Sequence, residues 1–251
     1  MNLTLMRAVL PCAVAVLVLA SEASQSSGAL IVPTAGDERF GWDDSDLGAA
    51  FAEWAGFAPA GQITGPFSPT SSTASSQSSG LTEHSMTAIV TSTSSAIYSF
   101  SAATEFSADV KTTNLSGTQT RVVAQIQASG TGLDLSSLLL NGQTASVSGI
   151  ADSRMVTSFA GPTLQSDYMA IWDFAASPLD EYSLAFNSLG PHMSLEAVRI
   201  DAFASDTAFV TPASVTAVPE PASIGSVLAL TCGGGIRWLR RRKSSAKAKR
   251  S

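Results

Sequence analysis

From Met86 onward, apolar and polar residues alternate along most of the chain. Successive side chains of a β-strand point to opposite faces, so a period of two indicates strands with one buried face. Turn-forming Gly, Pro and Asn residues separate the alternating runs. The pattern therefore predicts an all-β fold, an antiparallel β-sandwich with about nine strands. The candidate strands, of which the first is the shortest, lie near residues 30–33, 86–91, 95–101, 104–112, 119–128, 144–151, 154–160, 167–175, 181–187 and 194–203.

The chain before Met86 is less regular. Phe51, Trp54 and Phe57 recur within residues 47–57, which fits one short amphipathic helix or an irregular aromatic cover. Residues 58–80 are rich in Ser, Thr, Pro and Gly, a composition typical of a long loop or a linker.

Charge and cysteine content limit what the central part, residues 30–217, can bind. Five basic residues stand against 18 acidic ones there, a formal charge of −13, which excludes a nucleic-acid partner because such proteins need a basic face. The two cysteines, Cys12 and Cys232, both lie outside this range. The central part can therefore form neither disulfides nor thiolate metal sites. Its length suits one domain with a hydrophobic core.

The first 29 residues have the layout of a secretory signal peptide. Arg7 supplies a positive charge, an apolar run covers residues 8–20, and small residues follow. We therefore expect residues 1–29 to be removed and residues 30–217 to be exported.

The end of the chain carries a three-part pattern. Proline at positions 219 and 221 fixes the backbone and removes two hydrogen-bond donors, so the motif is a stiff, extended strip. The apolar run 222–236 that follows is short for a membrane span, which makes it a marginal anchor helix. Basic residues after it should stay in the cytoplasm under the positive-inside rule. The motif is Val218, Pro219, Glu220 and Pro221, and the basic stop is Arg240, Arg241, Arg242 and Lys243.

This order of motif, apolar run and basic cluster resembles the PEP-CTERM sorting signal, here over residues 218–243 with a basic tail at 244–251. The resemblance implies recognition by an exosortase, which would process the protein from an inner-membrane intermediate to the cell surface or the extracellular space. The strand expected at 194–203 is similar to the closing strand of many such proteins. Their exported domains often look like carbohydrate-binding jelly rolls, and we expect a jelly-roll-like sandwich here.

Two groups of residues are candidates for ligand binding. Trp42 and Trp54 lie in irregular segments and could stack on sugar rings, whereas Trp172 alternates within a strand and is expected in the core. Asp43, Asp44 and Asp46 offer closely spaced oxygen ligands for a structural calcium ion, although the spacing of an EF-hand is absent. The alternative is a solvated turn.

No set of residues predicts a catalytic site. The chain has only two histidines, His84 and His192, and no serine has the glycine pattern of a nucleophile elbow. A glycosidase needs a pair of carboxylates, and the acids near Trp172 are the candidates. They are Asp167, Asp173, Asp180 and Glu181. We expect a non-enzymatic surface or matrix protein, with an exopolysaccharide-binding module and a secreted hydrolase as the alternatives.

Overall fold

The computed structural model describes residues 30–158 and 161–216. The predicted signal peptide, sorting signal, anchor helix and basic tail lie outside these residues. Across the two described ranges, no helix is both long and apolar enough to cross a membrane. Their single helical element is a short 3-10 turn, η1 (Ala74–Ser76).

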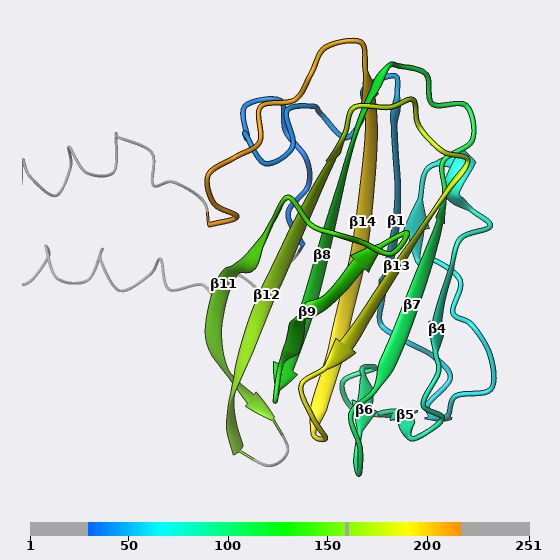
Figure 1. Ribbon diagram of the computed structural model, residues 1–251. Coiled ribbons are helices and arrows are strands. Elements are labelled where there is room, and N and C mark those ends of the chain that lie inside the picture. Colours follow the sequence, from blue (N-terminus) through cyan, green and yellow to red (C-terminus); the bar gives the residue numbers. More distant parts are fainter. Residues whose placement is uncertain (1–29, 159–160, 217–251) are drawn as a thin grey trace, which may run out of the picture.

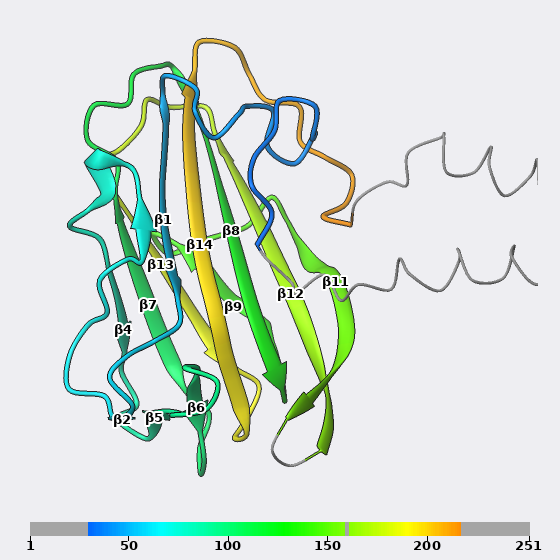
Figure 2. The same cartoon turned by 180° about the vertical axis from the view of Figure 1, so that it is seen from behind.

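Two antiparallel sheets face each other across a shared hydrophobic core (Figures 1 and 2). The larger sheet runs in the order β11 (Val147–Ser158), β12 (Gly161–Phe174), β8 (Gln119–Gly130), β14 (Met193–Ser205), β6 (Ile97–Ser99), β5 (Ala88–Val90) and β2 (Gly61–Gln62). Beside β6, the later part of β14 pairs with β1 (Ala49–Ala55), which also pairs with β3 (Ser71–Ser72). The smaller sheet runs in the order β10 (Gln143–Thr144), β9 (Leu133–Leu140), β13 (Glu181–Ser188), β7 (Glu105–Lys111) and β4 (Gly80–Glu83).

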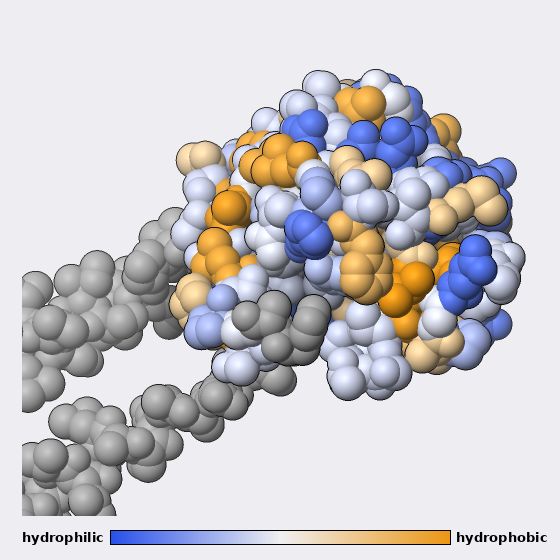
Figure 3. Space-filling view, turned by 90° about the horizontal axis from the view of Figure 1, so that it is seen from below, coloured by the Kyte–Doolittle hydropathy of each residue, from blue (hydrophilic) through white to orange (hydrophobic). Residues whose placement is uncertain are grey.

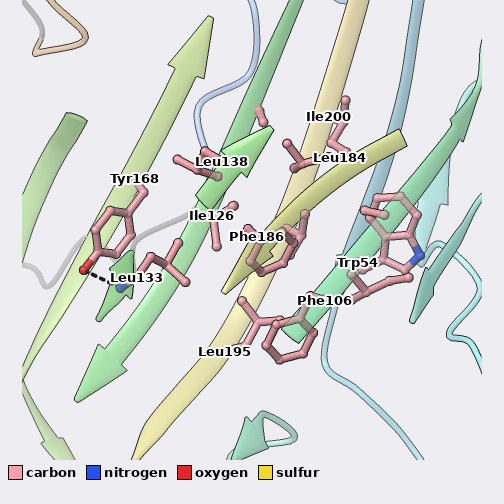
Figure 4. Close-up of a cluster of buried hydrophobic side chains, with 14 of the residues drawn as sticks. Trp54, Phe106, Ile126, Leu133, Leu138, Tyr168, Leu184, Phe186, Leu195 and Ile200 are labelled. Atoms are coloured by element: carbon pink, nitrogen blue, oxygen red, sulfur yellow. Dashed lines mark hydrogen bonds between the residues drawn. The ribbon is translucent and has the colours of Figure 1, made fainter. Parts of the chain in front are cut away.

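The core between the sheets is built from the inward-facing residues of the alternating strands. Phe106 of β7 and Phe186 of β13 stack with their ring centroids 5.0 Å apart. Trp54 of β1 is fully buried, and its indole N–H donates to the carbonyl of Phe67 at 3.0 Å. Figure 4 shows these rings gathered with aliphatic side chains of β8, β9 and β14. Burial of this apolar surface is the main source of stability in such a domain.

A second hydrophobic cluster covers the outer face of the larger sheet. Trp42 stacks on Phe203 of β14, with ring centroids 5.1 Å apart, and both belong to this cluster. Segments from both ends of the described chain contribute to it, which Figure 1 shows in blue and orange beside β8 and β12. Gln125 of β8 fixes the first of these segments, because its side-chain amide both accepts from the N–H and donates to the carbonyl of Ile31, each at 2.7 Å. The buried members are Phe40, Trp42, Val123, Met169, Ile171 and Val215.

Arg121 of β8 ties this cover to the sheet. The residue is 1% exposed, and two of its nitrogens bind the carboxylate of Asp173 at 2.6 and 3.0 Å. Other N–H groups of the same guanidinium donate to the carbonyls of Glu38 and Val210 at 2.9 and 2.8 Å. The guanidinium also lies 4.8 Å from the ring centroid of Phe209. One arginine therefore joins the N-terminal segment, β12 and the C-terminal segment.

Arg199 of β14 forms a second buried network. It binds Asp201 at 2.7 Å, Asp44 at 2.5 Å and Glu53 at 3.1 Å, and lies over the ring of Phe51 at 4.2 Å. Burial lowers the pKa of Arg199, but Asp201, Asp44 and Glu53 outweigh it and raise the pKa above its usual value. Burial raises the pKa of Asp201 to about 6, against the opposing effect of Arg199. The cation is thus the group that holds three carboxylates at this position.

The structure confirms the all-β fold with antiparallel sheets and the core position of Trp172. It corrects the interpretation of residues 47–57, most of which form β1 (Ala49–Ala55) instead of a helix or an irregular cover. Four alanines, spread over the two faces of the strand, leave the sequence without a clear alternation. Residues 30–33 form no strand, because Ile31 pairs with a side-chain amide in place of a neighbouring strand. The loop predicted at 58–80 contains β2, β3 and η1.

Two further strand boundaries differ from expectation. β9 was not among the predicted strands, because its run of leucines does not alternate with polar residues. The irregular pattern goes with a register shift in the pairing of β9 with β13, between Ala185 and Asn187. The segments predicted at 144–151 and 154–160 belong largely to one strand, β11. A register shift between Ile150 and Asp152 interrupts the alternation there and made one strand look like two.

Replacing Arg199 with Ala should lower the free energy of unfolding by about 3–5 kcal/mol, because it leaves Asp201 as a buried charge without its cation. Chemical denaturation of the purified full-length chain measures this change. Lys111→Ala is the matched control, since the pair of Lys111 and Glu181 is partly exposed and should contribute at most about 1 kcal/mol. Equal losses in the two variants would contradict the assigned role of Arg199.

Candidate functional site

The outer face of the larger sheet is divided into two parts. The second hydrophobic cluster covers one part, and the part near the β11–β12 turn holds an open cleft of about 970 Å³. Figure 3 looks at this end of the molecule and shows mostly weakly polar surface between separate hydrophobic patches. The cleft has the size of a ligand site for a small molecule or a short oligomer.

Neighbouring strands of the sheet place the floor of the cleft. Ser129 of β8 and Tyr98 of β6 lie in register with Ser194 of β14, one on each side. Glu196 follows at a register shift between β14 and β8, and its carboxylate accepts a hydrogen bond from the Ser129 hydroxyl at 3.2 Å. Burial raises the pKa of Glu196 above its usual value, although hydrogen bonds from Ser194 and Ser129 oppose this effect. The floor thus carries a carboxylate that is partly shielded from water.

Aromatic rings form one side of the cleft. The Tyr98 hydroxyl lies 2.9 Å from Nδ1 of His192, which fixes both rings. Phe100 packs edge-on against Tyr98 with ring centroids 4.6 Å apart, and half of the Phe100 residue (50%) remains exposed. The Phe100 ring therefore offers apolar surface to the cleft, with the rings of Tyr98 and His192 held beside it.

A close backbone contact fixes the position of His192. Gly130, the last residue of β8, has φ +89°, and a Cβ there would lie 2.0 Å from the carbonyl oxygen of His192. Only glycine fits this approach, and it also tolerates the positive φ. The contact brings the end of β8 against the turn that precedes β14, and so places His192 beside the floor of the cleft.

The opposite side of the cleft comes from the β11–β12 hairpin. Val156, Thr157 and Thr163 line it there, and the turn between β5 and β6 closes the third side. Nine of the 17 described lining residues carry an aliphatic hydroxyl, and none of these 17 is a Lys or Arg. The hydroxyl-bearing residues are Thr91, Thr93, Ser94, Ser129, Thr131, Thr157, Ser158, Thr163 and Ser194.

The two tryptophans predicted to stack on sugar rings are both in hydrophobic clusters. Trp42 is 1% exposed and Trp54 is 0% exposed. Phe203 covers a face of the Trp42 ring, and the Trp54 side chain lies in the core between the sheets. Neither ring offers a face to a ligand, so the structure corrects this prediction.

The three aspartates considered for calcium each have a contact within the protein. Asp43 accepts from the N–H of Ala35 at 2.9 Å, Asp46 accepts from the N–H of Asp43 at 2.9 Å, and Asp44 binds Arg199. Among residues 30–158 and 161–216, no three His, Cys, Asp or Glu side chains are grouped as metal ligands. The geometry is that of a hydrogen-bonded turn anchored by one ion pair.

The residues weighed for catalysis are not brought together as a triad. His84 is exposed, and its Nε2 lies 2.8 Å from the Ser107 hydroxyl, while His192 contacts Tyr98. The candidate carboxylates on strands have basic partners: Asp167 binds Arg154 at 2.8 Å, Asp173 binds Arg121, and Glu181 binds Lys111. Asp180 is exposed. These contacts give the three paired acids a structural role.

No family model, curated protein or solved structure matches this chain in the comparisons with known proteins. The description of the cleft therefore depends on its own geometry. Sequence reasoning missed Tyr98, Phe100 and Glu196 as site residues. Two features of the sequence could have indicated these residues. One is Tyr98-Ser99-Phe100, which places two aromatic residues at the end of a strand, and the other is Glu196, an acidic residue in a strand otherwise rich in apolar residues.

Trp42→Ala should lower the free energy of unfolding by about 3–5 kcal/mol, as expected for removal of a buried aromatic side chain. Chemical denaturation of the full-length chain measures the loss. Leu47→Ala is the control, because Leu47 is 99% exposed and its truncation should change the free energy by less than about 0.5 kcal/mol. A Trp42→Ala protein as stable as the control would contradict the core position of this ring.

Glu196→Gln should change how stability depends on pH. Because the pKa of Glu196 is raised in the folded protein, this carboxyl favours folding when protonated and loses that contribution as the pH rises through its folded pKa. The wild type should therefore lose stability relative to the Gln variant as the pH increases from about 4 to about 7. Denaturation curves at several pH values measure this difference. A constant difference across the range would contradict the shielded position of the carboxyl.

Proposed function

We propose that this chain is an exported bacterial surface or extracellular-matrix protein, sorted and processed by an exosortase, and that its role is non-enzymatic. The observation that carries the proposal is the order of features at the chain end, the Val218–Pro221 motif, the apolar run and the Arg240–Lys243 cluster. A signal-peptide pattern at the other end supports export. The proposed route passes through an inner-membrane intermediate to the cell surface or the extracellular space.

The described domain supports an extracytoplasmic role. It is an all-β fold without cysteine in residues 30–158 and 161–216, so its folding does not depend on the redox state of the compartment. We propose that the two sheets form a jelly-roll-like sandwich of the kind common in exported domains.

The contacts of the candidate acids favour the non-enzymatic role over the hydrolase alternative. A general acid or nucleophile must reach a substrate, and Asp167, Asp173 and Glu181 are instead engaged by basic side chains. A Ser-His-Asp mechanism needs its base held by a third group. His84 contacts the hydroxyl of Ser107, and His192 contacts the hydroxyl of Tyr98.

Carbohydrate binding is the second candidate function, and the open cleft favours it. The cleft combines an exposed aromatic ring at Phe100 with a lining of hydroxyl groups and one carboxylate. Such a combination suits an exopolysaccharide of the surrounding matrix, since aromatic rings pack on the apolar faces of sugar rings.

Replacing Glu220 with Ala should block processing in a host that contains an exosortase, because it removes the acidic group of the Pro-Glu-Pro motif. The unprocessed protein should then accumulate in the inner membrane, where fractionation and immunoblotting detect it. Thr216→Ala is the control, a nearby exposed position outside the motif that should leave processing unchanged. Normal processing of the Glu220→Ala protein would overturn the sorting proposal.

A further inference from the structure

We propose that the cleft on the outer face of the larger sheet binds an uncharged oligosaccharide, with Phe100 as the stacking ring and Glu196 as the hydrogen-bond acceptor at the floor. This inference rests on the second candidate function and adds the binding residues and the class of glycan. Each part follows from the lining of the cleft.

The charge of the cleft selects against anionic glycans. Among the described residues of the lining, Glu196 is the only acidic side chain, and none is a Lys or Arg that could pair with a uronate, sulfate or phosphate. The whole of residues 30–217, with Glu196 included, has a formal charge of −13. An anionic glycan would therefore bring a like charge to a partly buried carboxylate without a compensating cation.

The polar groups of the floor suit sugar hydroxyls. The Glu196 carboxylate accepts from Ser129, and a carboxylate oxygen can accept more than one hydrogen bond. A sugar hydroxyl that donates to this carboxylate forms a charge-assisted bond, which is stronger than a bond between neutral groups. Hydroxyl groups such as those of Thr131 and Thr163 can both donate and accept, and so can the hydroxyl groups of an uncharged sugar.

The aromatic side of the cleft supplies the apolar contact. Phe100 is 50% exposed, and its ring is held by the edge-on packing against Tyr98. The contact between Tyr98 and His192 holds that second ring in turn. A ring kept in place before the ligand arrives loses little conformational freedom on binding, so more of the contact energy contributes to affinity.

Isothermal titration calorimetry on the full-length chain in mild detergent tests the proposal. The probes are hexasaccharides of β-1,4-linked glucose and of α-1,6-linked glucose, and a matched oligomer of a hexuronic acid. We expect binding of at least one glucose oligomer and at least about tenfold weaker binding of the uronic acid oligomer. Equal binding of the charged oligomer, or binding of neither glucose oligomer, would overturn the proposal.

Variants then test the site itself. Phe100→Ala and Glu196→Gln should each weaken binding by about tenfold or more. Phe100→Tyr should retain binding because it keeps the ring, and Leu47→Ala should bind like the wild type. Denaturation curves establish that each variant is folded.

If the wild type binds glucose oligomers and both cleft variants bind equally well, this cleft is not the site, although carbohydrate binding stands. If the wild type binds neither, the carbohydrate function fails as well, and the sorting proposal is still judged separately by Glu220→Ala.

Discussion

The domain depends on two buried arginines that lie on the outer face of its larger sheet. On a sheet face open to water, polar groups are hydrogen-bonded by the solvent. Here segments from both ends of the described chain cover part of the face, and the two arginines bind the carbonyl and carboxylate groups beneath the cover. Arg121 collects carbonyl groups from both segments and pairs with Asp173, and Arg199 holds Asp44 and Asp201. Each buried cation is compensated by carboxylates, which is the condition under which burial of charge is tolerated. Residues 30–158 and 161–216 contain no cysteine, and their two end segments are fastened to the sheet by ion pairs in place of disulfides.

This cover also determines where a ligand can bind. It seals the region around Trp42 and leaves the region around Glu196 open, so one sheet face carries both a hydrophobic cluster and a cleft. The same strands, β8 and β14, cross both regions, which connects the arginine networks rigidly to the floor of the cleft. The shape of the site is therefore a consequence of how the ends of the domain fold back.

Local patterns in the sequence predict the strands but not what covers them. The alternation of Val122, Ala124 and Ile126 correctly predicted a strand, because side-chain period is a local property. Arg121 occupies a polar position in this alternation, and the strand pattern by itself would place such a side chain in solvent. Arg121 is nevertheless 1% exposed, because segments about 80 to 90 residues away fold over it. Trp42 is buried by other long-range contacts, with the rings of Phe203 and Phe209. The site residues Phe100 and Glu196 come from separate segments, so no spacing in the sequence could have joined them.

One consequence concerns mechanical load. The described chain ends at Thr216, just after Val215, whose carbonyl accepts from Arg39 and whose side chain lies in the outer cluster. If the protein is tethered beyond this point, any pulling force first reaches the irregular segment 206–216 and not β14. That segment can peel from the sheet and lengthen while β14 stays paired on both sides with β8 and β1. Under load, the segment 206–216 would then detach and extend before the strands of the two sheets separate.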